Sequence, residues 1–414
     1  MRIAYISTCQ PRECGLATFN ENLVQAVDQH IPFSEHGSFM VALNDSDDKR
    51  QYAYDDNVKF VISQERLSDY QAAAAFINGN GVDMCCIQHE FGIYGGRSGV
   101  YLLALTRLLK VPYTVIFHTV LAQPDPIQLS IVKRLSARAA AVVVMTKKAV
   151  QLLRSVYNLS SNKIKAIPHG VPDFDKPDLT VIKSHLGLPT GKILLTFGLL
   201  GPSKGLETTI RSLPAICRQH PDVRYVILGK THPGILRNFG EDYRNSLMEL
   251  AKKLGVEDHL IFISEFVHEK KLHAYLSACD IYITPYPNEA QITSGTLSYA
   301  IGAGAAVVST PYWHAAELLK GDRGKLFDFN NDRQLSTIIN ELLNNPSELK
   351  SLKRNAYRHG LSLRWPKIGK QYAQLFKAHV KTEERPSLPE QALMQVTSSF
   401  SRTLTWNTLE VKTT

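Results

Sequence analysis

Short, almost wholly apolar runs recur along this chain, separated by longer segments of mixed polarity. They are RIAYIS, MCCIQ, YTVIF and AAAVVVM in the first part, and KILLTFG, VRYVILG, LIFIS, IYITP and AAVVST in the second. Such runs are typical of parallel strands that are buried on both faces. Segments such as residues 206–219 and 241–254 have a helical pattern instead. Strands that alternate with helices predict an α/β fold made of doubly wound sheets.

The series of strands divides near residue 180. The stretch IPHGVPDFDKPDLTV is rich in Pro, Gly and Asp and reads as a linker, and a fresh strand, KILLTFG, follows it. A chain of 414 residues fits two domains. We therefore expect two Rossmann-like domains, residues 1–177 and 178–365, that face a central cleft at the carboxyl ends of their strands. Residues 366–385 are expected to form a helix that crosses back to the first domain, and residues 386–414 a tail.

Composition and cysteine usage suggest a cytoplasmic protein. Hydrophobic residues make up 44% of the chain and charged residues 21%, and no apolar run is long enough to span a membrane. The first residues lack the apolar segment and cleavage site of a signal peptide. The six cysteines show no paired CxxC units and no zinc spacing, so we expect reduced thiols.

The net charge of +9 is unevenly placed. No Asp or Glu occurs between Pro126 and Pro172, while eight Lys and Arg residues do. Within this segment TKKAVQLLRSVYNL would form a basic amphipathic helix, which can lie on an anionic membrane surface. A solvated helix face on a soluble domain is the reading we favour, with weak peripheral contact at the inner membrane face as the alternative. No nucleic-acid-binding motif accompanies the charge.

Five motifs in a fixed order resemble one known family. They are CGLATF in the first loop, FHT after a strand, IPHGV before the linker, FGLLGPSKG at the start of the second domain, and SGTLSYAIGAGAAVVST. The chain thereby resembles the family 4 retaining glycosyltransferases of the GT-B fold, also called group 1 glycosyltransferases, over roughly residues 1 to 380. The resemblance implies a nucleotide diphosphate sugar as co-substrate and no further cofactor.

The resemblance also implies which residues bind the donor diphosphate. Gly15, between the first strand and the first helix, would let the backbone approach the phosphates. Lys204, flanked by Gly201, would neutralise the diphosphate as it leaves. The family usually has an Arg five residues before this Lys, where this chain has Leu199.

Further candidate residues follow the carboxyl ends of other strands. His118 would contact the transferred sugar near its reacting carbon, as the resemblance implies. The acceptor side is expected to include Arg12, His89 and Glu90. In LGKTHPG, Lys230 or His232 could contact base, ribose or phosphate of the donor.

The stretch from Asn288 to Pro311 departs from the family's pattern. The family has two acids with seven residues between them, one that holds sugar hydroxyls and one that holds the ribose, and this chain has Gln291 and Tyr299 at those positions. Glu289, two residues earlier, could supply the missing carboxylate if the loop is displaced. The start of the following helix suits a phosphate, with the alternative of simple N-capping, and comprises Thr293, Ser294, Gly295 and Thr296.

These expectations predict a retaining hexosyltransferase that moves mannose or glucose to a saccharide or lipid-linked acceptor. The first loop holds no His that could serve as the base of an inverting enzyme. No metal is expected, because DSD at residues 45–47 and DFD at residues 173–175 lie in a polar run and in the linker. A GT-B phosphorylase that uses free phosphate, and a non-catalytic nucleotide-sugar-binding protein, are the alternatives.

Overall fold

The computed structural model describes residues 1–31, 37–46, 48, 52–174 and 179–380. The first half of the chain forms a seven-stranded parallel sheet in the order β3-β2-β1-β4-β5-β6-β7. Its strands are β1 (Ile3–Ser7), β2 (Phe39–Asn44), β3 (Val58–Ser63), β4 (Met84–His89), β5 (Tyr113–Phe117), β6 (Ala141–Val144) and β7 (Ile164–Ala166). Every residue of β1, β2, β4, β5 and β6 is buried, as the apolar runs predict for strands covered on both faces.

Helices connect the strands of this first sheet. They are α1 (Gly15–Asp28), α2 (Leu67–Gly79), α3 (Leu102–Leu108), α4 (Pro126–Arg138) and α5 (Lys147–Ser155), with short turns η1 (Arg97–Gly99) and η2 (Ser161–Lys163). Local sequence sets where they begin: α4 starts with Pro126 behind a capping box of Asp125 and Gln128. The N-cap of α1 is Cys14, whose sulfur accepts a hydrogen bond from the Ala17 amide at 3.4 Å.

The second half repeats this topology in a six-stranded parallel sheet of order β10-β9-β8-β11-β12-β13. Its strands are β8 (Ile193–Phe197), β9 (Arg224–Leu228), β10 (Leu260–Ile263), β11 (Ile281–Thr284), β12 (Ala306–Ser309) and β13 (Gly324–Leu326). The connecting segments are α6 (Leu179–His185), η3 (Pro202–Lys204), α7 (Leu206–Gln219), α8 (Pro233–Phe239), α9 (Asp242–Lys253), η4 (Glu257–His259), α10 (Glu269–Ala278), α11 (Gly295–Gly302), α12 (Trp313–Leu318) and α13 (Asp332–Asn344). In both sheets the order reverses beside the first strand, and a doubly wound fold binds its ligands at that switch point.

The linker after the first sheet is hydrogen-bonded to the segment between the last two helices, so the two chain crossings between the halves lie side by side. Val171, which follows the first sheet, donates its amide to the Leu363 carbonyl at 2.9 Å and accepts a hydrogen bond from the Trp365 amide at 2.9 Å. Arg364, between helices α14 (Pro346–Leu363) and α15 (Trp365–His379), forms an ion pair with Asp173. The linker and the junction of the last two helices therefore hold each other by backbone hydrogen bonds.

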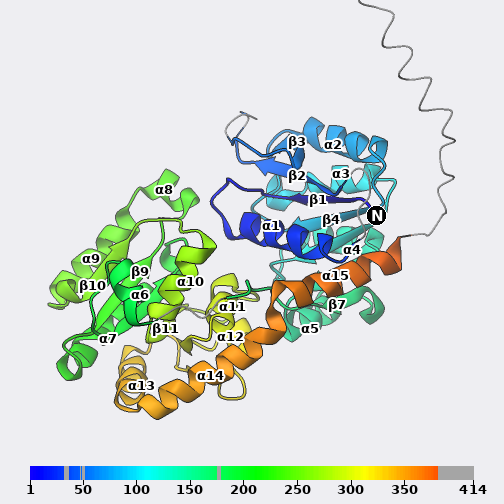
Figure 1. Cartoon of the computed structure of the whole chain (residues 1–414). Helices are drawn as coiled ribbons and strands as arrows, with labels where there is room; N and C mark the ends of the chain where they lie inside the picture. The colour runs from blue at the N-terminus through cyan, green and yellow to red at the C-terminus, as the bar shows by residue number, and fades with distance from the viewer. Residues whose placement is uncertain (32–36, 47, 49–51, 175–178, 381–414) are drawn as a thin grey trace, which may run out of the picture. The chain divides into compact units, whose positions relative to one another are not determined.

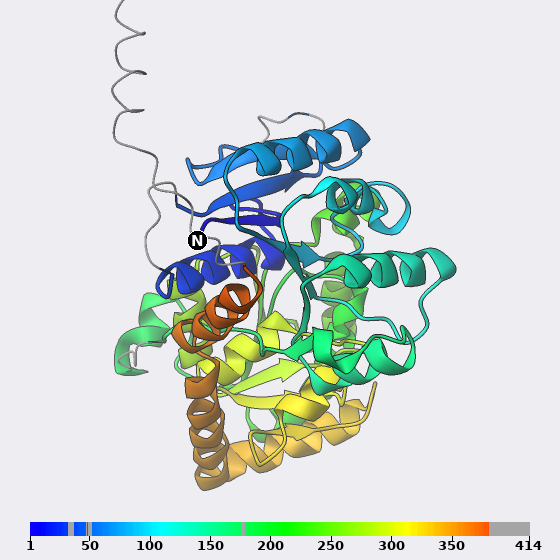
Figure 2. The same cartoon turned by 90° about the vertical axis from the view of Figure 1, so that its right-hand side faces the viewer.

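The last helix, α15, packs along α1 of the first half, and both views show the two side by side (Figures 1 and 2). The contact is close because Gly369 of α15 lies against the backbone of Ala26, where a Cβ atom would be 2.3 Å from the Ala26 carbonyl oxygen. Lys377 adds a hydrogen bond to the His30 carbonyl at 2.9 Å.

Most of the predicted elements are present. Residues 206–219 form α7, residues 242–253 form α9, and the chain from Asp332 to His379 is helical in three segments. The predicted tail, residues 386–414, lies outside the described residues, and the predicted domain limits stay predictions. In the part of the chain that the structure describes, no helix has the length and apolar character to cross a bilayer.

Candidate active site

A cleft of about 1200 Å³ lies at the carboxyl ends of strands from both sheets. Its walls are the loop after β1 with the first turns of α1, the loops after β8, β9 and β10, and the face of α11. The switch-point rule for doubly wound sheets places a ligand in such a position. The predicted site residues that line this cleft are Arg12, Gly15, Gly201, Lys204, His232, Gly295, Thr296 and Tyr299.

Lys204 enters the cleft from the turn that joins β8 to α7. Its Nζ donates a hydrogen bond to the Tyr286 hydroxyl at 3.1 Å and lies 4.7 Å from the centre of that ring. The turn requires Gly205, which has φ 61° and whose Cβ would lie 2.2 Å from the Pro285 carbonyl oxygen. The glycine beside Lys204 therefore brings the turn against the end of β11, within reach of Tyr286.

Tyr286 links Lys204 to the start of α11. Its hydroxyl lies 3.2 Å from Thr296 Oγ1, which lies 3.1 Å from Ser294 Oγ. Burial raises the pKa of Tyr286, but the Lys204 ammonium and the hydrogen bonds with Ser294, Thr296 and Lys204 outweigh it, so the pKa is lowered overall. The Lys204 ammonium is the largest of the contributions that lower the pKa of this phenol.

The first turn of α11 is held by two histidines. Ser294 is the N-cap, with its hydroxyl accepting from the Leu297 amide, and its own amide donates to His314 Nδ1 at 2.8 Å. His169 lies so close that a Cβ on Gly295 would be 3.0 Å from its Nε2. Burial lowers the pKa of His314 to about 3 and that of His169 to about 4, so both are neutral at pH 7. The first amides of a helix lack acceptors within it, so beside Lys204 this helix start suits a phosphate.

Other predicted donor-side residues have structural partners in this structure. Gly201 lies against Ile235, where a Cβ would be 2.4 Å from Ile235 Cδ1, whereas Gly15 faces open space. Lys230 forms an ion pair at 2.6 Å with Glu13 from the loop after β1, and both side chains are about half-exposed. His232 caps α8 through its Nδ1, which accepts from the Gly234 amide at 3.1 Å.

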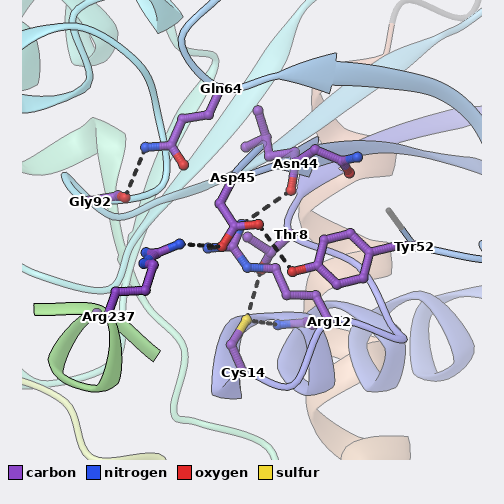
Figure 3. A network of polar contacts seen from close by, with 12 residues as sticks. Thr8, Arg12, Cys14, Asn44, Asp45, Tyr52, Gln64, Gly92 and Arg237 are labelled. Atoms are coloured by element: carbon purple, nitrogen blue, oxygen red, sulfur yellow. Dashed lines mark hydrogen bonds and ion pairs between the residues drawn. The ribbon is translucent and has the colours of Figure 1, made fainter. Parts of the chain in front are cut away.

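Arg12 belongs to a charged network at one edge of the cleft. Figure 3 shows Asp45 in its middle, with Arg12 and Arg237 on either side and the Tyr52 hydroxyl bonded to the same carboxylate. The two ion-pair distances are 3.6 Å to Arg12 and 3.5 Å to Arg237, and Arg237 comes from α8 of the second sheet. Asp45 is the first residue of the DSD run, whose Asp47 lies outside the described residues.

His118, His89 and Glu90 are not among the residues that line this cleft. His118 Nε2 lies 2.9 Å from Gln88 Oε1, and its ring packs edge-on against Phe19, a cleft residue. Burial lowers the pKa of His118 and of His89 to about 3. Glu90, whose pKa is raised by burial, accepts a hydrogen bond from the Thr119 hydroxyl at 2.6 Å. All three lie at the carboxyl ends of β4 and β5, where His89 is buried and His118 and Glu90 are half-buried, and their predicted roles stay predictions.

The loop that carries Glu289 and Gln291 lies outside the lining of this cleft, and both side chains are exposed. Gln291 Nε2 donates to the Thr293 carbonyl at 2.5 Å. The loop is anchored by Ile292, which is 2% exposed and packs in the core of the first half of the chain. No hydrogen bond or ion pair within the described residues engages the Glu289 carboxylate, so a sugar-binding role for it stays a prediction.

Tyr299 lines the cleft and forms hydrogen bonds with two residues that the sequence analysis did not identify. Its hydroxyl donates to Glu269 Oε1 at 2.7 Å, and Asn22 of α1 donates to the same oxygen at 2.6 Å. No motif marked Asn22, Glu269, Tyr286 or His314. His169 could have been found, because it is the histidine of the IPHGV motif.

In the basic segment before Pro172, helix α5 exposes its basic side chains, but its apolar side packs against the core. Leu153 and Tyr157 are buried in the core, and Val150 is half-buried against it. Lys147 and Arg154 are exposed on α5. A helix that lies on a membrane needs its apolar side for the lipid, and α5 uses that side for the first sheet.

Two family models match the chain, one on each half. The model of the glycosyl transferases group 1 matches residues 180–359, and that of glycosyltransferase family 4 matches residues 44–173. Together they cover most of the chain. The chain belongs to the group 1 glycosyltransferases, which confirms the family that the sequence motifs indicated.

Individual relatives are distant. Spore coat protein SA of Bacillus subtilis (strain 168) is 26% identical over 202 residues, which are 47% of this chain and 51% of that protein. A D-inositol 3-phosphate glycosyltransferase of Thermobispora bispora is 24% identical over 241 residues, 58% of this chain and 56% of that protein. The chain thus matches about half the length of these relatives.

Solved structures extend the likeness of fold to nearly the whole chain. HepE of Anabaena in complex with UDP superimposes with a TM-score of 0.74 at 16% identity, covering 91% of this chain and 100% of that one. Sucrose-phosphate synthase of Thermosynechococcus elongatus gives 0.75 at 16% identity, covering 91% and 99%. The predicted GT-B fold, with two Rossmann-like parallel sheets, is confirmed.

Proposed function

We propose that this protein transfers a hexose from a nucleotide diphosphate sugar to a saccharide or lipid-linked acceptor, with retention of the anomeric configuration. The observation that carries the proposal is that Lys204 and the first turn of α11 both line the cleft and are joined through the buried Tyr286 hydroxyl, which contacts Lys204 and Thr296. A fixed ammonium, hydroxyl donors and free helix amides together favour a diphosphate that gains charge as it leaves.

The proposed chemistry breaks the bond between the sugar's anomeric carbon and the diphosphate oxygen and forms a bond from that carbon to the acceptor oxygen. The departing phosphate oxygen takes the acceptor's proton on the same face of the sugar, so the mechanism requires no separate protein base. Lys204 would stabilise the negative charge that develops, a contribution of about 3 kcal/mol for donors of this kind.

The loops of the first sheet would hold the acceptor. Arg12 and Glu13 line the cleft from the loop after β1, and Glu13 reaches across to Lys230. Contacts of this kind between the two sheets would narrow the cleft around the substrates and exclude water, so that transfer outpaces hydrolysis.

The experiment is a screen of nucleotide sugars by thermal shift, followed by turnover assays with the ones that bind. Binding raises apparent stability by mass action, so the true donor should raise Tm. Proton NMR of the fresh product then gives the anomer. We expect the product to retain the anomeric configuration of the donor, and an inverted anomer would contradict the proposed mechanism.

Two other outcomes would replace the proposal. Tight binding of a nucleotide sugar with no turnover over hours would identify a non-catalytic binding protein. Phosphate-dependent breakdown of a glycoside would identify a phosphorylase. UDP-glucose is the first donor to test, since HepE, which shares the fold, has been crystallised with it.

A further inference from the structure

Three helices meet at one carboxylate inside the cleft. Glu269 is the first residue of α10, is half-buried and lines the cleft. Its Oε1 accepts 2.7 Å from the Tyr299 hydroxyl of α11 and 2.6 Å from Asn22 Nδ2 of α1. Asn22 Nδ2 also lies 3.2 Å from the Tyr299 hydroxyl, so the three polar groups form one closed cluster.

The cluster leaves the charge of Glu269 unneutralised. Both donors are neutral groups, and no Lys, Arg or His within the described residues forms an ion pair with Glu269. Its other oxygen, Oε2, has no protein hydrogen-bond partner in the same part of the chain. An ionised carboxylate accepts hydrogen bonds at both oxygens, and vicinal hydroxyls of a ligand are donors that match it.

The position of the carboxylate selects which hydroxyls it can reach. Tyr299 lies four residues beyond Gly295, about one helical turn or 6 Å along α11 from the proposed diphosphate site. Phe266 and Val267, two residues just before Glu269, also line the cleft and offer apolar surface for a planar base. A group between a diphosphate and a base is the ribose of a nucleotide.

We propose that Glu269 binds the 2′- and 3′-hydroxyls of the donor's ribose, while Tyr299 and Asn22 position its carboxylate. This deepens the proposed function and rests on it. Position 299, where the family resemblance expects the ribose-binding acid, supplies a hydroxyl instead, and the carboxylate comes from a different helix. Because Asn22 belongs to the first sheet, ribose recognition in this chain depends on both halves of the fold.

The test measures binding of UDP and GDP, and of their 2′,3′-dideoxy analogues, to the full chain by calorimetry. With whichever nucleotide binds more tightly, the wild type should prefer the ribose form by at least about tenfold, the value of one charge-assisted hydrogen bond. Glu269→Gln should lose most of this preference and leave affinity for the dideoxy form unchanged. Tyr299→Phe and Asn22→Ala should each reduce the preference several-fold.

Glu265→Gln is the matched control. Glu265 lines the same cleft four residues earlier, but Lys271 already pairs with its carboxylate at 2.5 Å. Its variant should keep the wild-type preference. A wild-type preference that survives Glu269→Gln, or that is missing from the start, overturns the inference while nucleotide binding still supports the proposed function. A wild type that binds no nucleotide overturns both.

Discussion

At the residue scale, Lys204 is the cation of the proposed diphosphate site. The family's usual Arg is Leu199 here, so no second cation stands at that position of the turn. Lys204→Ala should therefore lower kcat by about a hundredfold or more. Folding should change little, since Tyr286 keeps its contact with Thr296. Lys252→Ala, on the exposed face of α9, is the control, and a folded Lys204→Ala variant with normal turnover would remove Lys204 from the site.

A Glu289 variant tests whether this loop binds the sugar of the donor. If its free carboxylate turns toward a bound sugar, charge-assisted hydrogen bonds of about 1.5–3 kcal/mol would fix the reacting carbon. Glu289→Ala should then lower transfer at least about tenfold, and Gln291→Ala should do so more mildly. Affinity for the free nucleotide should not change, because Lys204 and α11 remain. Steady-state rates beside nucleotide titrations separate the two effects, and unimpaired transfer by Glu289→Ala would contradict the sugar-binding role.

At the scale of elements, the contact of α15 with α1 depends on one missing side chain. A Cβ at Gly369 would meet the backbone of Ala26 at 2.3–2.4 Å, and backbone atoms cannot rotate away. Gly369→Ala should lower the free energy of unfolding by about 1–3 kcal/mol, although alanine favours an isolated helix. Gly79→Ala at the end of α2 has nothing within 4 Å and should be neutral or slightly stabilising. The measurement is the urea midpoint of unfolding of both variants. Equal midpoints would show that α15 can shift away from α1 and relieve the clash.

At the scale of the whole molecule, three buried histidines and the half-buried His118 link stability to pH. Burial lowers the pKa of His89, His118 and His314 to about 3 and that of His169 to about 4, from an ordinary 6.5. In the unfolded chain these histidines take up protons as the pH falls below about 6.5, whereas in the folded chain they stay neutral. This stability is therefore nearly complete at about pH 7.5, has begun to fall at pH 6.5, and falls at lower pH by up to about 1.4 kcal/mol per pH unit for each histidine. Glu90 and Asp28, whose pKa values burial raises, act in the opposite direction but are two groups against four.

The measurement is the urea midpoint at pH 7.5, 6.5 and 5.5. The midpoint should fall slightly from pH 7.5 to 6.5 and drop clearly further at pH 5.5. An unchanged midpoint at pH 5.5 would show that these histidines are already hydrated or protonated in the folded protein.

The sequence by itself determined the repeating elements, because a parallel strand that is buried on both faces is a continuous apolar run in the sequence. The four apolar runs of the first half correspond to β1, β4, β5 and β6, and the five runs of the second half correspond to β8 to β12. The motifs located Lys204, Gly295 and Thr296, since glycine-rich turns after strands are local features as well. The strands β2, β3 and β13 were not predicted. Lys59 interrupts the apolar pattern of β3, and β13 has only three residues, whereas the apolar run FMVAL of β2 is a signal that could have been recognised.

Only the tertiary structure decided which side chains meet. Glu269 has nothing in its own segment to mark it, and Asn22 lies 247 residues away, yet they share a 2.6 Å hydrogen bond. The same holds for Tyr286 beside Lys204, and for the ring of His118, which packs edge-on against Phe19 of α1. Local patterns record how each residue is buried along its own element. Which carboxylate reaches a cleft depends on how helices from two sheets pack, and that packing is set by contacts distant in the sequence.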